Sequence, residues 1–165
     1  MRTSEYPFSA LTTLNRPVCQ PWLMSPANLD LVRSIYAAWE RGDFSSAEWA
    51  DPEIELAIAD GPSPGNWTGR ARIAEGWRDF FSAWEDWRVY VDEYRELDGE
   101  RVLVLEDRSA RAKISGLRIG KMVGETRSTG ASLFHVRDGK VTRFVTYFDR
   151  ERAFSDLGLA PEAGP

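Results

Sequence analysis

The feature that most constrains the fold is a change of hydrophobic period near Asp86. Before this residue, apart from a short stretch at 53–59, apolar side chains recur every three or four positions, as on one face of a helix; after it they alternate. The helical pattern covers 25–41, 43–49 and about 70–84. The alternating pattern covers 87–97, 101–113, 126–137 and 140–148. Helices followed by sequentially adjacent strands predict an α+β fold, with helices on one face of a curved antiparallel sheet.

Turn and capping residues divide these segments. Ser25-Pro26 suits the start of a helix, and Gly42 suits its end. Asp98-Gly99 and Asp138-Gly139 each predict a tight hairpin turn between two strands. A further strand is expected over 53–59, a loop over 60–66 and a short closing helix over 149–157.

We expect one domain over residues 25–159, preceded by a flexible tail at 1–24 and followed by a frayed end at 160–165. The tail contains Pro7, Pro17 and Pro21 and shows no helical period. An alternative is that Met24 is a second start, because the folded pattern begins directly behind it. The 165 residues suffice for one domain with a substantial core.

Composition excludes several classes of site. The chain has a single His, His135, and a single Cys, Cys19, which excludes multi-His and Cys-based metal sites. It carries no glycine-rich nucleotide motif, so we expect neither metal nor cofactor. A net charge of −5 argues against nucleic acid as a partner, and no apolar run approaches a membrane span. We therefore expect a cytoplasmic protein.

Four sequence segments carry a resemblance to a known family. They are Tyr36–Asp43, Trp49-Ala-Asp-Pro52, Gly69–Ile73 and the stretch from Arg137 to Asp149. In this order and spacing the chain resembles the nuclear transport factor 2-like superfamily, in particular its SnoaL-like group, over residues 26–159. The resemblance implies a cone-shaped α+β barrel, a curved antiparallel sheet wrapped around three N-terminal helices, and a hydrophobic pocket. It also implies a homodimer through the outer sheet face. The family includes enzymes and non-catalytic binders, so the fold alone does not give a function.

The catalytic positions of two enzyme types in this family are not filled here. Ketosteroid isomerase chemistry uses a Tyr, a carboxylate base and a protonated Asp. The chain has Ile35, Ala57 and Ser132 at the matching positions, with Tyr36 turned about 100° from the first.

Epoxide hydrolase chemistry uses an Arg flanked by two Asp residues, with a Tyr and an Asn. Here Thr146 stands at one Asp position, and Asp107 and Ser109 stand at the Arg and Asp positions. Glu55 and Ala57 replace the Tyr and the Asn. Neither mechanism is expected.

Asp149 matches a carboxylate that polyketide cyclases of the family use as an acid or base near the end of the last strand. The same residue stands where the closing helix needs an N-cap, and Asp is among the best capping residues. Both roles are open, and capping is the stronger.

Strand alternation predicts which side chains share the inner face. Taking Ala57 and Ser132 as inward also turns Glu55, Asp107, Ser109 and Arg111 inward. With aromatic residues of the helices and the 60–66 region, this gives a pocket for a small apolar or aromatic molecule, although ordinary core packing would use the same rings. The expected ligand-binding residues are Tyr36, Trp39, Trp67, Phe80, Trp84, Ser109, Ser132, Phe134, Phe144, Thr146 and Phe148.

Asp107, Asp149 and Glu55 are the candidate catalytic residues, because a carboxyl in an aromatic pocket can act as an acid or base. The alternative for Glu55 and Asp107 is that both face solvent or a dimer partner. His135 is expected to point away from the pocket, and the basic stretch from Arg108 to Gly124 to be a solvated hairpin tip.

Two functions remain open. One is a cofactor-free cyclase, isomerase, dehydratase or hydrolase, and the other is a non-catalytic ligand-binding or dimerisation module. A pocket of roughly 300 Å³ or more with a carboxylate at its floor would support the enzyme. A hollow filled by the chain's own Trp and Phe side chains would support the module.

Overall fold

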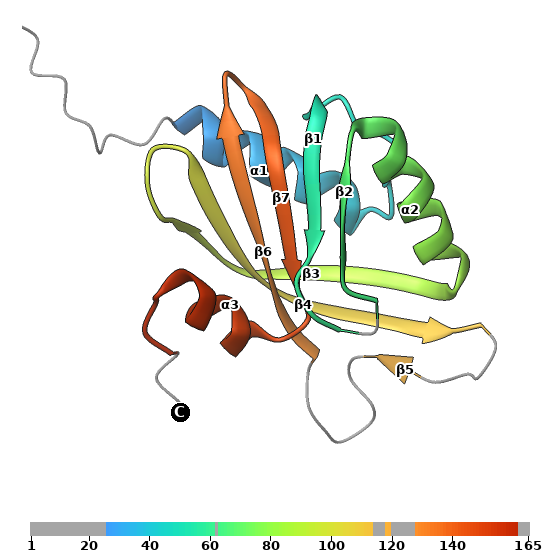
Figure 1. Ribbon diagram of the computed structural model, residues 1–165. Coiled ribbons are helices and arrows are strands. Elements are labelled where there is room, and N and C mark those ends of the chain that lie inside the picture. The colour runs from blue at the N-terminus through green and yellow to red at the C-terminus, as the bar shows by residue number, and fades with distance from the viewer. Residues whose placement is uncertain (1–25, 62, 114–117, 120–127, 162–165) are drawn as a thin grey trace, which may run out of the picture.

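A computed structural model describes residues 26–61, 63–113, 118–119 and 128–161. The expected tail at 1–24 and most of the basic stretch from Arg108 to Gly124 lie outside the described residues. Within them the chain forms three helices and one seven-stranded sheet (Figure 1). The elements are α1 (Pro26–Glu40), β1 (Ala50–Ile58), β2 (Gly65–Thr68), α2 (Arg70–Ser82), β3 (Trp84–Glu96), β4 (Arg101–Ala112), β5 (Arg118–Ile119), β6 (Ser128–Arg137), β7 (Lys140–Tyr147) and α3 (Arg150–Leu157).

The sheet is curved and mixed, not wholly antiparallel. Its strand order is β2-β1-β7-β6-β4-β3, with β5 paired to β4. The β1–β7 pair is parallel and the other pairs are antiparallel, which corrects the expectation of an antiparallel sheet. A parallel pair needs a long crossover, and the chain from α2 to β6 supplies it. The α+β class is confirmed.

The helices lie on both faces of the sheet. Residues of α1 share one apolar core with the inner side chains of β1, β4, β6 and β7, and α2 packs against that core. Residues of α3 share a second core with the opposite side chains of β4, β6 and β7. Figure 1 shows α3 apart from α1 and α2. Only two helices are therefore N-terminal, where three were expected.

The segment 43–49 is not a helix because its own polar groups form turns. The carboxylate of Asp43 accepts hydrogen bonds from the backbone N–H of Ser45 at 3.1 Å and from its hydroxyl at 2.7 Å. The indole N–H of Trp49 donates to the carbonyl of Ser46 at 2.8 Å. Such local bonds offer the backbone an alternative to helical hydrogen bonding.

The two predicted hairpin turns are confirmed. Asp98 accepts backbone hydrogen bonds from Glu100 and Arg101, at 3.0 and 2.9 Å. Asp138 and Gly139 both have positive φ, 50° and 72°, as a two-residue turn between twisted strands requires. The β4–β6 and β6–β7 registers align Val104, Ser132 and Thr146 across three strands.

Strand β3 begins three residues before the expected position and is bulged. Its register against β4 shifts between Glu85 and Arg88, and Asp86 has a φ of 53°. An extra residue in one strand re-aims the side chains beside it. Trp87, which lies within this irregular stretch, lines the pocket described below.

Candidate functional site: an aromatic pocket with a buried ion pair

A pocket of about 100 Å³ lies between the helices α1 and α2 and the inner face of the sheet. Most of its lining is aromatic. The rings come from α1, α2, β2, β3, β7 and the segments beside them. They belong to Trp39, Phe44, Trp67, Trp77, Phe80, Phe81, Trp87, Phe144 and Phe148.

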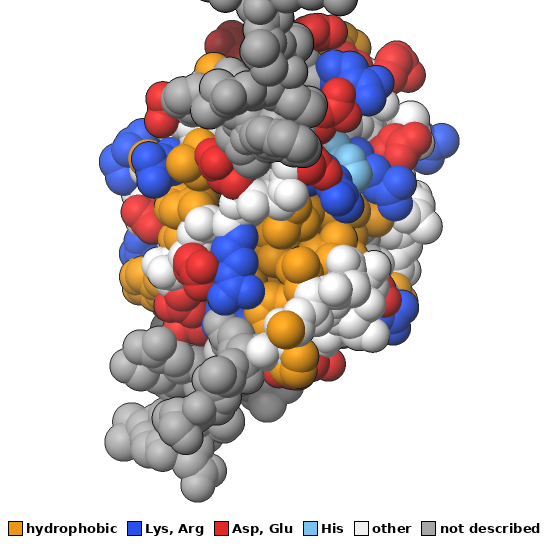
Figure 2. Space-filling view, turned by 90° about the vertical axis from the view of Figure 1, so that its left-hand side faces the viewer, with side chains coloured by type: hydrophobic (Ala, Val, Ile, Leu, Met, Phe, Trp, Pro, Cys, Tyr) orange, Lys and Arg blue, Asp and Glu red, His pale blue; other side chains and the backbone are white. Residues whose placement is uncertain are grey.

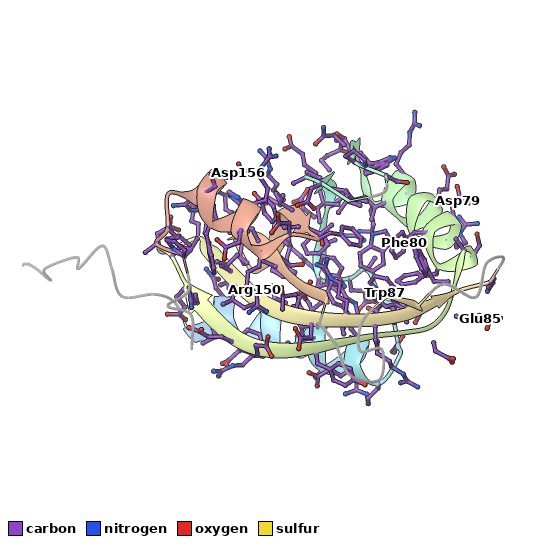
Figure 3. All side chains as sticks on the ribbon, turned by 90° about the horizontal axis from the view of Figure 1, so that it is seen from below. Asp79, Phe80, Glu85, Trp87, Arg150 and Asp156 are labelled. Carbon is purple, nitrogen blue, oxygen red and sulfur yellow. The ribbon has the colours of Figure 1, made fainter. Side chains whose placement is uncertain are left out.

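Seven of these rings contact one another, those of Trp39, Phe44, Trp77, Phe80, Phe81, Trp87 and Phe144. The centroids of Trp39 and Trp77 are 5.4 Å apart, and those of Phe80 and Trp87 are 4.9 Å apart in an edge-to-face arrangement. Figure 3 shows Phe80 and Trp87 close together, while Asp79 and Glu85 project away from them. Offset and edge-to-face pairs are the arrangements that aromatic quadrupoles favour. The helical side of the pocket is therefore apolar.

The polar groups of the pocket come from three neighbouring strands. Glu106 and Arg108 of β4, Ser132 of β6 and Thr146 of β7 line it. Ser132 lies opposite Thr146 in the β6–β7 register, and residues directly opposite share one face of a sheet. We call these four residues the polar wall.

Glu106 is the carboxylate of this wall, and it is 2% exposed. Its Oε1 accepts hydrogen bonds from Arg108 Nε at 2.9 Å and from the Ser132 hydroxyl at 2.9 Å. Arg108 Nη2 also donates to Oε1, and the Tyr36 hydroxyl donates to Oε2. A carboxylate this deeply buried requires such partners.

Arg108 is equally buried and is held from several sides. Its Nη1 donates to the carbonyl of Tyr147 at 2.9 Å, and its Nη2 donates to the Thr146 hydroxyl at 2.6 Å. Its guanidinium lies over the ring of Phe148, 5.0 Å from the centroid. Gly130 leaves room for this group, because a Cβ there would lie 2.8 Å from Nη1.

Tyr36 supports the ion pair from behind. Its ring is fully buried and lies outside the pocket lining, in edge contact with Trp39 and Phe134. Burial, and after it the negative charge of Glu106, raises the pKa of Tyr36 well above its ordinary value. The hydroxyl therefore remains a proton donor to Glu106 throughout the neutral pH range.

Seven of the expected ligand-binding residues line the pocket. They are Trp39, Trp67, Phe80, Ser132, Phe144, Thr146 and Phe148.

The other four lie elsewhere. Tyr36 and Phe134 are fully buried beneath the pocket, and Trp84 packs against Phe80 and Trp87 without lining it. Ser109 follows Arg108 on β4, so strand alternation turns it to the opposite face.

The structure places Asp107 and Glu55 away from the pocket. Asp107 lies beside Arg150 at the start of α3, with Arg150 Nη2 4.0 Å from its Oδ1. Glu55 is exposed and lies 3.7 Å from Arg143 on the outer face. The expected inward orientation of both carboxylates is thus corrected: Leu56 and Ile58 of β1, and Glu106 and Arg108 of β4, point inward instead.

On β4, the residues that face the pocket differ by one position from those expected. The cause is the continuous apolar run from Val102 to Leu105. Val102 and Val104 belong to the core under α1, whereas Leu103 and Leu105 belong to the core under α3. A strand buried on both faces shows no alternation, so its sequence does not tell which residues face the pocket. A spacing of two between Glu106 and Arg108 is the one signal that could have indicated a shared face.

Asp149 is the N-cap of α3. Its carboxylate accepts a hydrogen bond from the backbone N–H of Glu151 at 3.0 Å, and its φ and ψ are those of an extended residue. It does not line the pocket. The geometry is that of the capping alternative.

Capping predicts a specific mutational pattern at Asp149. We expect Asp149→Ala to lower the free energy of unfolding by about 0.5–2 kcal/mol, and Asp149→Asn to leave it nearly unchanged, because Asn caps as well as Asp. Urea unfolding followed by circular dichroism measures both. A loss in Asp149→Asn equal to that in Asp149→Ala would show that the negative charge, not the cap, matters.

His135 lies away from the pocket, as alternation predicted. It lines a groove on the opposite face with Arg143 and Tyr147. Burial, and then the charge of Arg143, lowers its pKa, so it is neutral at pH 7. The described residues hold no group of three or more His, Cys, Asp or Glu side chains suited to a metal ion. None of the helices in this part of the chain has the length and apolar character of a membrane span.

Comparison with solved structures shows the same fold. An NTF2-like protein from Burkholderia pseudomallei K96243 is 23% identical, with 80% of this chain and 97% of that chain covered and a TM-score of 0.64. TerC, co-crystallised with polyporic acid, is 24% identical, with 79% of this chain and 97% of the TerC chain covered and a TM-score of 0.61. A third solved structure is a protein of ketosteroid isomerase-like fold from Catenulispora acidiphila DSM 44928, in complex with trimethylamine. It is 15% identical, with 82% of this chain and 98% of that chain covered and a TM-score of 0.57.

No functionally curated protein matches the sequence significantly. The family model described as the SnoaL-like domain matches residues 32–144, which is more than half of the chain. Together with the fold of the solved neighbours, this match shows that the chain belongs to the SnoaL-like domain family, within the nuclear transport factor 2-like fold.

Proposed function

We propose that the pocket binds a small, flat, uncharged molecule whose apolar body lies among the aromatic rings. The observation that carries this proposal is the combination of a mostly aromatic lining with one compact polar wall. Ligand pockets typically have this composition, with a few polar groups that fix orientation. Two solved neighbours, TerC with polyporic acid and the Catenulispora protein with trimethylamine, hold small molecules in the same fold.

The volume limits the ligand to about one ring. The pocket measures about 100 Å³, which is smaller than the apolar cavity of about 150 Å³ that takes benzene, so one ring is the upper limit. The ion pair of Glu106 and Arg108 is neutral as a whole, so the polar wall favours a hydroxyl or carbonyl group over a charged one. Phenol is the simplest probe with both properties.

Binding is better supported than catalysis. Glu106 is the one carboxylate among the described pocket residues, and both of its oxygens already accept hydrogen bonds. The second candidate, cofactor-free acid–base catalysis, would rest on Glu106. Native mass spectrometry of the purified protein, followed by analysis of any released molecule, tests whether a bound compound is retained unchanged.

Gly76 gives the proposal its sharpest test, because it lines the pocket from the middle of α2. A Cβ there meets nothing within 4 Å. We expect Gly76→Ala to raise the free energy of unfolding by about 0.5–1 kcal/mol, since glycine is unfavourable inside a helix. Gly76→Leu should fill the pocket and weaken phenol binding at least about tenfold, measured by tryptophan fluorescence.

Ala71→Leu is the matched control, because Ala71 is exposed on the same helix and lines no described cavity. It should leave phenol binding unchanged. Equal binding by the wild-type protein and Gly76→Leu would place the ligand outside this pocket.

We further propose that a second copy of the chain packs on the outer sheet face. Figure 2 shows hydrophobic side chains gathered on a face beside the pale-blue histidine. A groove of about 490 Å³ opens there, lined among others by Leu133, His135, Val145 and Tyr147. Light scattering should give twice the chain mass of 18.7 kDa. A single-chain mass at all micromolar concentrations would contradict the dimer.

A further inference from the structure

A second cavity, larger than the first, lies between α2, the start of β1 and the segment before β1. Its volume is about 400 Å³. Phe44, Trp77 and Phe81 line both cavities and therefore form the partition between them. The remaining apolar lining includes Trp49, Ile54 and Ile73. The cavity is large enough for a two-ring molecule, which the first pocket is not.

The charges at this cavity are of one sign. Among the described residues that line it, Arg70 and Arg78 of α2 are charged and none is acidic. Within residues 26–61, 63–113, 118–119 and 128–161, neither arginine forms an ion pair. Asp43 directly precedes Phe44, a lining residue of this cavity, and its carboxylate accepts two hydrogen bonds from Ser45.

Arg70, which lines this cavity, has one buried donor without an acceptor among the described residues. Arg70 Nη2 donates to the carbonyl of Ala50, but Arg70 Nε is buried and has no hydrogen-bond partner among the described residues. Arg78 Nε makes only a long hydrogen bond, 3.4 Å, to the carbonyl of Ala74. A buried guanidinium N–H without an acceptor is costly, and a carboxylate is the acceptor that best matches it.

We propose that this second cavity binds an organic carboxylate with an apolar body, its anion held by Arg70 and Arg78 and its body placed against Trp49, Ile73 and Trp77. The site is independent of the pocket at Glu106. That pocket presents a neutral ion pair, whereas the described lining of this cavity presents two cations and no anion.

The test uses 2-naphthoate and its uncharged analogue 2-naphthamide in calorimetric titrations at low ionic strength. Wild-type protein should bind 2-naphthoate at least about tenfold more tightly than 2-naphthamide. Arg78→Gln and Arg70→Gln should each remove most of this preference. Arg72→Gln is the matched control, because Arg72 is an exposed arginine of α2 that lines neither cavity.

Further measurements on Gly76→Leu, on the two probes and on Arg72→Gln either support or overturn the proposal. Gly76→Leu narrows only the first pocket, so it should leave 2-naphthoate binding intact while it weakens phenol binding. Loss of 2-naphthoate binding in Gly76→Leu would place the anion in the first pocket and overturn the proposal. Equal affinity for the two probes, no binding of 2-naphthoate, or an equal loss in Arg72→Gln would also overturn it. Thermal unfolding of Arg70→Gln shows whether its loss of 2-naphthoate binding comes from a loss of folding. If it does, the affinity of Arg78→Gln for 2-naphthoate decides the proposal.

Discussion

Replacing Arg108 by methionine is expected to lower the free energy of unfolding by about 3–5 kcal/mol. The Glu106 and Arg108 side chains are only 3% and 4% exposed, so the change would leave the Glu106 carboxylate buried without its counterion. Removing one partner of a buried pair costs far more than the pair itself contributes. The carbonyl of Tyr147 and the hydroxyl of Thr146 would also lose a donor. Chemical unfolding followed by circular dichroism measures the loss.

The double variant Glu106→Met with Arg108→Met is the control for this prediction. It removes both charges, and it also removes the acceptor of the Tyr36 and Ser132 hydroxyls. We expect it to be more stable than Arg108→Met alone, because apolar replacement of a whole buried pair is often nearly neutral. A double variant as unstable as the single one would show that the uncompensated charge is not the cause.

Replacing Trp39 by alanine is expected to cost about 3–5 kcal/mol and to enlarge the pocket. The indole is 5% exposed, lines the pocket and contacts the rings of Tyr36, Trp77 and Phe144. Loss of a large core side chain removes buried apolar area and leaves a cavity. The variant should therefore bind 2-naphthol better than phenol, reversing the order of the wild-type protein. Unfolding and fluorescence titrations measure the two effects.

Trp84→Ala is the matched control, because it deletes the same side chain beside the pocket. Trp84 is half-buried and packs against Phe80 and Trp87 without lining the pocket. We expect a loss of about 1 kcal/mol, the usual size for a partly exposed site. Its order of affinity for phenol and 2-naphthol should stay as in the wild-type protein. An unchanged order in Trp39→Ala would mean that the ligand does not contact Trp39.

The residues that local physics governs could be predicted from the sequence. Turns at Asp98-Gly99 and Asp138-Gly139 depend on a few neighbouring residues, and both are present. The inward orientation of Ser132, Phe144 and Thr146 also agrees with alternation. Local reasoning was wrong at 43–49, where side-chain hydrogen bonds of Asp43 and Trp49 replace the expected helix.

The chemistry of the pocket depended on distant parts of the chain. Glu106 meets Tyr36, 70 residues away, and Arg108 meets Thr146, 38 residues away. Their strand is buried on both faces, so nothing in its apolar run distinguishes Asp107 from Glu106. The packing of α3 on one face and α1 on the other selects Glu106 for the pocket.

By itself, the sequence determined the α+β class, the hairpin turns and the aromatic character of the pocket, because periodicity and turn chemistry act over a few residues. Only the tertiary structure decided that β1 runs parallel to β7 and that Glu106, not Asp107 or Glu55, lines the pocket. Strand partners and register are set by the packing of whole elements. A register shift of one residue moves every side chain of a strand to the opposite face of the sheet. The sequence of one strand alone does not specify which other strand it will pair with.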